Sequence, residues 1–368
     1  MSQNLGKFKN LGIILAVAIV VIIAVVALRP APQPAPVTPP PQAVTPAPAP
    51  VTPTPAPVTP APAPVQAGWE PDSPVTLIVP FPPGGSNDMV ARVIERYWYR
   101  YSPQPIVVVN KPGGGGITGA SYIAASEPDG LTIGIGFGRG HDLVMPHIET
   151  IEGYDTLRDL IPVANIVAET IAIAVHADSP FETMQDVINW SKTENQTITA
   201  AVSTAAGTVD IAMRGLGLRA GLNLTTVPHP GGAPARVTLV GGHTTIGGAH
   251  PAELIPLANS GVIRILAVAS PERVPVLPDV PTLIEQGIDF YTLGALMGIT
   301  LPQNTPEEIV TFYEDLFGKL AEDEDFKERL NDLSLPLFYL NAEDTVQTFK
   351  DMFEQYGTLI SDLGIVKQ

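Results

Sequence analysis

The chain has 368 residues, a formal net charge of −17, 40 prolines and no cysteine. The lack of cysteine excludes a disulfide framework and a cysteine-linked lipid anchor. The acidic balance and the absence of a Lys/Arg cluster disfavour nucleic-acid binding, because contact with phosphates requires a basic face.

Residues 1–29 predict a membrane anchor. Residues 11–28 form an unbroken apolar run of 18 residues, and a helix of that length, rising ~1.5 Å per residue, approaches the hydrocarbon thickness of a bilayer. Lys7 and Lys9 precede the run, so the positive-inside rule places the N-terminus in the cytoplasm and the rest of the chain outside. A cleaved signal peptide ending near Ala27 is the alternative, although signal cores are usually shorter.

Residues 30–67 predict a disordered linker. Prolines occupy 16 of the 35 positions between Pro30 and Pro64, and no charged residue occurs between Arg29 and Glu70. Such a segment cannot bury a core, so we expect an extended polyproline-like spacer of up to ~110 Å. A proline-rich motif recognised by a partner domain is the alternative.

The globular part begins at residue 68 and carries all 37 acidic residues. The negative charge of this part repels an anionic ligand at long range, so hydrogen-bond donors close to the ligand must bind it. Apolar runs alternate with segments of helical period. We expect strands at 75–79, 106–109 and 131–137 with helices at 87–101 and 118–125, then strands at 171–175, 197–202, 225–228 and 244–246 with helices at 184–190, 208–220 and 233–239.

This alternation predicts an α/β fold with two lobes. The near-continuous apolar strands favour parallel sheets covered on both faces. A strand over 262–270 is expected to return the chain to the first lobe, and residues 306–367 read as helices with one short strand near Leu337. The two crossings make a hinge, with lobe 1 formed by 68–172 and 264–368 and lobe 2 by 173–263. Ligands of such sheets bind beyond the carboxyl ends of the strands.

The turn after the first strand is a candidate anion site. Its glycines allow positive φ and close backbone approach, and free N–H groups at the start of the following helix can bind a carboxylate. The candidate residues are Pro83, Gly84, Gly85, Ser86, Asn87 and Asp88. A capped turn without a ligand is the alternative.

At this point the sequence resembles a known family, the receptors of tripartite tricarboxylate transporters, also called the Bug family. The resemblance runs in order from about residue 74 to the C-terminus. It is carried by Pro-Gly-Gly-Ser-Asn-Asp-Met-Val-Ala-Arg at 83–92, Asn-Lys-Pro-Gly-Gly-Gly-Gly at 110–116, Pro-Asp-Gly-Leu-Thr at 128–132, Val-Pro-His-Pro-Gly-Gly-Ala-Pro-Ala at 227–235, Gly-Gly at 241–242 and Leu-Pro-Asp-Val-Pro-Thr at 277–282.

The resemblance implies a type II periplasmic-binding-protein fold and a receptor without catalytic activity or cofactor. It implies a small carboxylate ligand, a di- or tricarboxylate or a related acid, and a partner made of membrane transporter subunits. We expect a monomeric, extracytoplasmic protein held at the cell membrane. Its ligand loops would be the turn at 83–88 and a second one formed by Ser203, Thr204, Ala205, Ala206, Gly207 and Thr208.

Four further residues are candidates for the cleft. Arg139 and His141 follow the third strand, and the guanidinium of Arg139 suits a second carboxylate, although it could equally pair with a surface acid. Gly248 and His250 lie where the family tends to place an acidic residue after a strand, and they would form a wall of the cleft. The second loop is usually richer in glycine and serine, so Ala205 and Ala206 make the pocket more apolar than expected.

Other classes of function have weaker signals. Gly114, Gly116 and Gly119 match a dinucleotide-binding pattern, but Pro112 interrupts it and the next strand has no terminal acid. The histidines lack metal-ligand spacing. A ligand sensor of the same fold remains an alternative, as does an extracellular hydrolase that pairs Ser86 or Ser203 with His250.

Overall fold

The computed structural model of the chain describes residues 68–292 and 294–367. The apolar run at 11–28 and the linker at 30–67 lie outside these ranges. Over the described ranges, no helix combines the length and the apolar character that crossing a membrane requires.

The first lobe is built on a six-stranded sheet with the order β11-β4-β10-β3-β1-β2. We use "first lobe" for this sheet and its helices. Its elements are β1 (Val75–Val79), α2 (Ser86–Tyr97), the 3₁₀ turn η1 (Trp98–Arg100), β2 (Ile106–Asn110), η2 (Gly114–Gly116), α3 (Ile117–Ala124), β3 (Thr132–Phe137), α4 (Gly140–Leu143), α5 (Met145–Ile148), α6 (Thr156–Asp159), β4 (Leu160–Glu169), β10 (Ala295–Pro302), α11 (Glu307–Glu322), α12 (Glu324–Asp332), β11 (Leu337–Asn341) and α13 (Ala342–Asp362).

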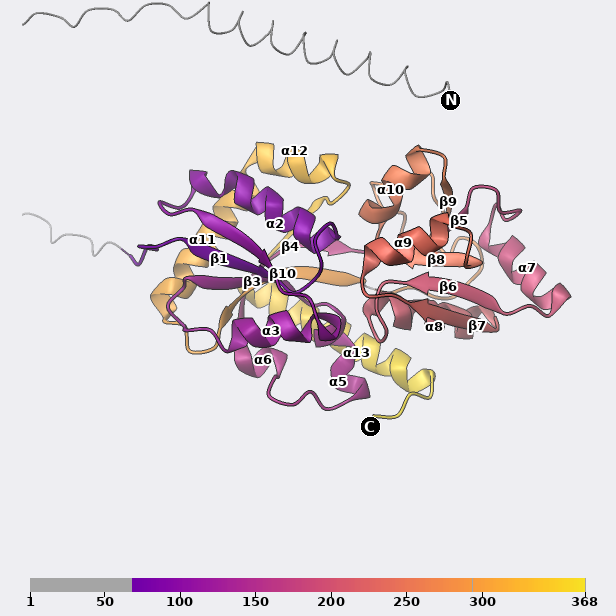
Figure 1. The fold of residues 1–368 in the computed structure, drawn as a ribbon, viewed down its shortest axis with the longest axis horizontal. Helices are drawn as coiled ribbons and strands as arrows, with labels where there is room; N and C mark the ends of the chain where they lie inside the picture. The colour runs from indigo at the N-terminus through magenta and orange to yellow at the C-terminus, as the bar shows by residue number, and fades with distance from the viewer. Residues whose placement is uncertain (1–67, 293, 368) are drawn as a thin grey trace, which may run out of the picture. The chain divides into compact units, whose positions relative to one another are not determined.

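The second lobe is built on a five-stranded sheet with the order β7-β6-β8-β5-β9. Figure 1 shows this sheet and its helices beside the first lobe. The elements are β5 (Ala172–His176), α7 (Met184–Glu194), β6 (Ile198–Val202), α8 (Thr208–Ala220), β7 (Leu224–Pro228), α9 (Gly232–Val240), β8 (Ile246–Ala249), α10 (Pro251–Asn259) and β9 (Ile263–Val268).

Local sequence explains most of these elements. Strand β1 reads Val-Thr-Leu-Ile-Val and is almost wholly buried, as expected for a central strand covered on both faces. Helix α7 begins at a capping box, in which Thr183 accepts from the backbone N–H of Asp186 and Asp186 accepts from that of Thr183. Helix α8 ends where Gly221 adopts a left-handed conformation.

The sheets differ from the expected parallel ones. Strands β1, β2 and β3 are parallel, as are β6, β7 and β8, but β10 runs antiparallel to β3 and β4, and β5 runs antiparallel to β8 and β9. Strands β4 and β10 were not expected at all. Pro162 and the buried Asn165 interrupt the apolar pattern of β4, and Gly298 interrupts that of β10.

Two further expectations need correction. Strand β9 does not return the chain to the first lobe, because it pairs with β5 at the edge of the second sheet. The return comes later, at β10. The strand expected at 244–246 instead spans Ile246–Ala249, since Gly247 and Gly248 pair with β5 on one side and Gly247 pairs with β6 on the other. The chain still crosses between the sheets twice, after β4 and before β10.

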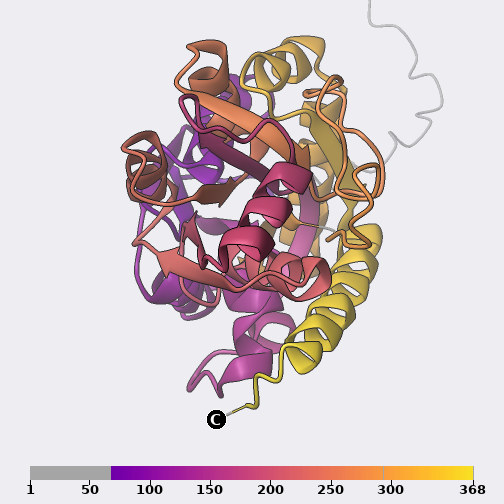
Figure 2. The same cartoon turned by 90° about the vertical axis from the view of Figure 1, so that its right-hand side faces the viewer.

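Helix α13 connects the lobes. It contacts β4 of the first sheet and α8 of the second lobe, and Figures 1 and 2 show it, in yellow, running along both lobes. Phe349, Met352 and Tyr356 of this helix belong to a buried cluster with residues of both lobes. The Tyr356 hydroxyl donates to the Gly294 carbonyl at 2.7 Å, which fixes the returning crossover. A Cβ on Gly294 would clash with the carbonyl of Glu169, so the two crossover segments lie against each other.

Candidate functional site

A cavity of about 100 Å³ lies between the carboxyl ends of strands from the two sheets. It is small compared with the engineered cavity of ~150 Å³ that admits benzene. Loops after β1, β3, β6, β7 and β8 supply almost all of its wall. The lining residues are Phe81, Pro82, Pro83, Gly85, Ser86, Asn87, Gly115, Arg139, Gly140, Ser203, Thr204, Gly207, Thr208, Gly231, Gly232, Ala233, Pro234, His250 and Glu253.

Three of these loops share one design. In each, a residue with positive φ stands just before the N-cap, and its N–H donates to an aspartate four positions later. The pairs are Gly84 N with Asp88 Oδ2 at 3.0 Å, Gly138 N with Asp142 Oδ2 at 2.9 Å and Ala206 N with Asp210 Oδ2 at 2.8 Å. The φ values are +82°, +83° and +54° for Gly84, Gly138 and Ala206. Each aspartate therefore folds its loop back and leaves the first turn of the helix facing the cavity.

Four helices of at least nine residues begin at the cavity: α2, α8, α9 and α10. Their N-cap residues are Gly85, Gly207, Gly231 and His250, and none of the four caps its helix with a side chain. First-turn N–H groups generally have no partner within the helix, but Pro234 in α9 and Pro251 in α10 have no N–H, and the N–H of Glu253 donates to the His250 carbonyl at 3.0 Å. The free N–H groups carry partial positive charge, which makes a carboxylate the kind of group that this wall can bind.

Arg139 is held in a buried ion pair. Its Nη2 lies 2.8 Å from Oε2 of Glu169, the last residue of β4, and both residues are 5% exposed. Ser86 Oγ donates to the same Oε2 at 2.8 Å and accepts from Nη2 at 3.3 Å. The side-chain oxygen of Asn87, in the amide orientation that satisfies both partners, accepts from Nη2 and Nε at 3.1 and 3.2 Å. Glu169 thus neutralises Arg139 within the protein.

The network also determines the tautomer of His250. Arg139 Nη1 lies 3.0 Å from His250 Nε2, and a guanidinium can only donate. The proton of a neutral His250 is therefore on Nδ1, which donates to the Thr170 carbonyl at 2.9 Å. His250 belongs to the second lobe, so this contact joins the two lobes at the cavity.

The described ranges do not contain the serine–histidine contact that the hydrolase alternative requires. The Ser86 hydroxyl donates to Glu169, and His250 Nε2 faces Arg139 rather than a serine. Neither Ser86 nor Ser203 forms a hydrogen bond with His250 within residues 68–292 and 294–367. A nucleophile and its base are thus not paired here.

The structure brings ten of the sixteen candidate residues together at the cavity: Pro83, Gly85, Ser86, Asn87, Arg139, Ser203, Thr204, Gly207, Thr208 and His250. The other six do not line it. Asp88 binds the backbone of its own loop, Gly84 and Ala206 adopt the positive φ of these loops, and Ala205 lies beside them. Gly248 packs against the Met213 side chain, because its strand begins two residues later than expected.

His141 is buried behind the cavity wall. Its side chain is 2% exposed, its ring contacts Phe81, and its Nδ1 has no hydrogen-bond partner in the described part of the chain. Burial lowers the pKa of His141 below its usual value. A Cβ on Gly116 would clash with this ring, and one on Gly119 would lie 2.5 Å from Pro80 Cα. Close packing therefore accounts for two glycines of the dinucleotide-like pattern.

Sequence reasoning missed several cavity residues and also Glu169, the ion-pair partner of the cavity residue Arg139. Glu169 was missed because β4 was not recognised. Gly231 and Gly232 stood in a recognised motif but were not assigned to the site, although Pro-His-Pro-Gly-Gly at 228–232 lies between a strand and a helix much as Pro-Phe-Pro-Pro-Gly-Gly does at 80–85. Glu253, in the first turn of α10, was also missed. Within the described residues, no group of three or more His, Asp or Glu side chains is placed to hold a metal ion.

Known proteins are similar to this chain over most of its length. The profile of the family described as "TctC: Tripartite tricarboxylate transporter family receptor" matches residues 90–365. Protein BugT of Bordetella pertussis is 29% identical over 240 residues, which cover 65% of this chain and 74% of that protein.

Two solved structures are similar over most of the chain. Rpa4515 of R. palustris, in complex with adipate, superposes with a TM-score of 0.75 at 26% identity and covers 81% of this chain and 99% of its own. MatC of Rhodopseudomonas palustris, with bound malate, gives a TM-score of 0.69 at 25% identity and covers 79% and 99%.

Proposed function

Because this chain belongs to the family of tripartite tricarboxylate transporter receptors, we propose that it is an extracytoplasmic receptor for a small carboxylate. The ligand would be a di- or tricarboxylate or a related acid, bound between the lobes and passed to membrane transporter subunits of the tripartite type. Adipate and malate in the two similar structures support a carboxylate as the ligand.

The observation that carries this proposal is the convergence of four helix N-termini on one interlobe cavity. Free N–H groups from both lobes would bind the same carboxyl group, so the ligand would stabilise the closed arrangement. Of the sequence candidates, Gly85, Ser86, Asn87, Gly207 and Thr208 are proposed as its direct contacts.

The arrangement of the whole chain is also a proposal. Residues 11–28 would anchor the protein in the membrane with the globular part outside, and residues 30–67 would act as a spacer. We keep the division into lobe 1 (68–172 and 264–368) and lobe 2 (173–263) as a working assignment. The second boundary would move toward residue 294, because β9 pairs in the second sheet and β10 in the first. A monomer remains the expected state.

A thermal-shift screen tests the function. The protein would be heated with mono-, di- and tricarboxylates and with their amides, since a ligand that binds only the folded state stabilises it by RT ln(1 + [L]/Kd). We expect at least one carboxylate to raise the melting temperature and its amide-capped analogue to do so less. If no carboxylate raises it at millimolar concentration, the proposed function is wrong.

A further inference from the structure

The carboxylate of Glu253 lies at the cavity, and one of its oxygens accepts no hydrogen bond from the described residues. Glu253 lies in the first turn of α10, lines the cavity and has a side chain that is only 7% exposed. Arg236 Nη1 of α9 lies 2.8 Å from Oε1. No hydrogen bond from residues 68–292 or 294–367 reaches Oε2. Oε2 is not among the fully buried side-chain atoms that lack a partner in the described residues, so it is open to the cavity and can accept a hydrogen bond from a ligand.

The charges around the cavity are already paired. Arg139 is the single Lys or Arg among the described residues that line it, and Glu169 neutralises that charge. Arg236 pairs with Glu253. A second carboxylate on the ligand would thus meet no free cation and would approach the carboxylate of Glu253. Burying such a like-charged pair is unfavourable.

Glu253 is also near the proposed carboxylate seat. A Cβ on Gly85, the N-cap of α2, would lie 3.9 Å from Glu253 Oε1. A short ligand seated on the first turn of α2 is therefore within reach of Glu253. The cavity volume of about 100 Å³ favours a short ligand over a long one.

We infer that Glu253 is the specificity-determining residue of the proposed receptor, and that it selects a short, singly charged carboxylate carrying a hydrogen-bond donor. The donor is a hydroxyl, a primary amide or an ammonium group, and the same carboxylate rejects a second acid group. This inference rests on the proposed function and narrows its ligand from di- and tricarboxylates to a related acid with a single carboxylate. It replaces the expectation that Arg139 pairs with a second carboxylate.

The competing interpretation is a structural one. An acid in the first turn of a helix interacts favourably with the helix dipole, and its pair with Arg236 joins α9 to α10. That interpretation predicts a change in stability when Glu253 is replaced and no change in the ranking of ligands. Ligand ranking therefore separates the two.

The experiment is calorimetric titration of the full chain with two matched series. One contains butyrate, γ-hydroxybutyrate, γ-aminobutyrate, succinamate and succinate, and the other contains the analogues one carbon shorter. In at least one series, we expect a donor-bearing member to bind about tenfold or more tightly than both the unsubstituted acid and the diacid, since a hydrogen bond to a carboxylate is a strong one. Which donor binds best identifies the ligand class.

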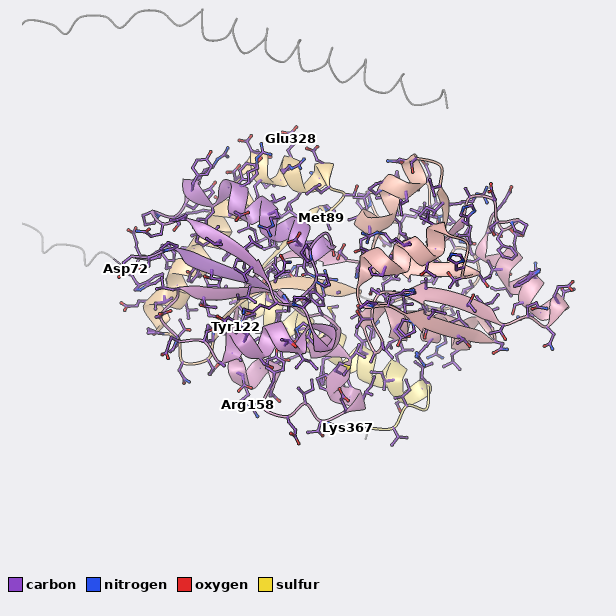
Figure 3. The ribbon with its side chains drawn as sticks, viewed as in Figure 1. Asp72, Met89, Tyr122, Arg158, Glu328 and Lys367 are labelled. Carbon is purple, nitrogen blue, oxygen red and sulfur yellow. The ribbon has the colours of Figure 1, made fainter. Side chains whose placement is uncertain are left out.

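Three variants sharpen the test. Glu253→Gln should shift the ratio of diacid to donor-bearing acid about tenfold toward the diacid, because its amide can donate to the second carboxylate. Arg236→Gln should increase the preference for the ammonium ligand, because Glu253 then lacks its partner. Glu328→Gln removes the same charge from α12, on the outer edge of the first lobe (Figure 3), and should keep the wild-type ranking.

The outcomes are distinguishable. If the diacid or the unsubstituted acid binds best in both series, or if Glu253→Gln leaves the ranking unchanged, the inference is wrong while the carboxylate receptor stands. If no member of either series and no larger carboxylate binds, the proposed function fails and the inference with it. Should Glu253→Gln not fold, the wild-type ranking and Arg236→Gln still decide.

Discussion

Gly140 of the first lobe and Gly207 of the second lie in direct backbone contact, since a Cβ on Gly140 would be only 2.8 Å from Gly207 Cα. Both glycines line the cavity. Two similar approaches flank them: a Cβ on Gly115 would lie 3.5 Å from Thr204 Cγ2, and one on Gly231 would lie 3.4 Å from Pro82 Cγ. Glycine is therefore what allows the two lobes to close around the site.

Gly140→Ala should hinder this closure. The added methyl group forces the loops apart, and overpacking of this kind costs about 1 to 3 kcal/mol, so we expect affinity for the ligand to fall about tenfold or more. Calorimetry measures the affinity, and small-angle scattering should show a larger radius of gyration with ligand present. Gly318→Ala in α11, where a Cβ would lie 3.4 Å from the Tyr339 hydroxyl, is the control. Equal affinity for Gly140→Ala and wild type would show that the lobes do not close through this contact.

Arg139→Gln should destabilise the fold rather than alter selectivity between acids. It leaves Glu169 buried without its cation, and breaking a buried ion pair costs about 3 to 5 kcal/mol. Arg139→Gln combined with Glu169→Gln should recover much of this loss, because no charge is then left unpaired. Urea unfolding of the wild type, both single variants and the double variant gives the coupling energy. Additive losses would contradict the paired arrangement.

Gly84 and Gly138, the two glycines with positive φ before an N-cap in these loops, should respond differently to a methyl group. Gly84→Ala has open space around its Cβ and should cost about 1 to 2 kcal/mol from the left-handed backbone alone. Gly138→Ala should cost more, because its Cβ would lie 2.6 Å from Leu296 Cβ. Urea midpoints of the two variants test this order, and equal midpoints would refute it.

His141 should make the fold sensitive to mild acid. Burial lowers its pKa in the folded state, so the unfolded state binds a proton first as the pH falls below about 6.5. The stability that comes from a neutral His141 is complete above that pH and is lost as the pH drops toward the folded-state pKa. His141→Phe retains a ring against Phe81 and cannot be protonated. Urea unfolding at pH 7 and pH 5 should show a smaller loss for the variant, and identical losses would exclude His141 as the cause.

The proposed anchor makes a prediction about processing. If residues 11–28 are retained, the full-length protein should sediment with membranes, and its intact mass should include Met1 or Ser2. Deletion of residues 1–67 should release a soluble protein with unchanged ligand affinity. A mature protein that begins near Leu28 would show that the segment is a cleaved signal instead.

Local signals in the sequence were enough for the strand-to-helix loops and for the elements around them. The position of β1 follows from its apolar run and that of α8 from its flanking glycines Gly207 and Gly221, and ten of the sixteen candidate residues line the cavity. Local signals suffice here because a Gly-rich turn after an apolar strand leaves free N–H groups whatever the rest of the chain does.

Tertiary structure alone decided the role of each charge. Arg139 and Glu169 are 30 residues apart, and they meet only because β4, whose pattern is interrupted by Pro162 and Asn165, ends beside the loop after β3. In the sequence, Glu253 is an ordinary acidic residue in the first turn of a helix. Only the approach of the two lobes in the structure places its side chain near Gly85. Whether a charged side chain is free for a ligand depends on distances across the fold, since Coulomb attraction and desolvation are set by separation and burial.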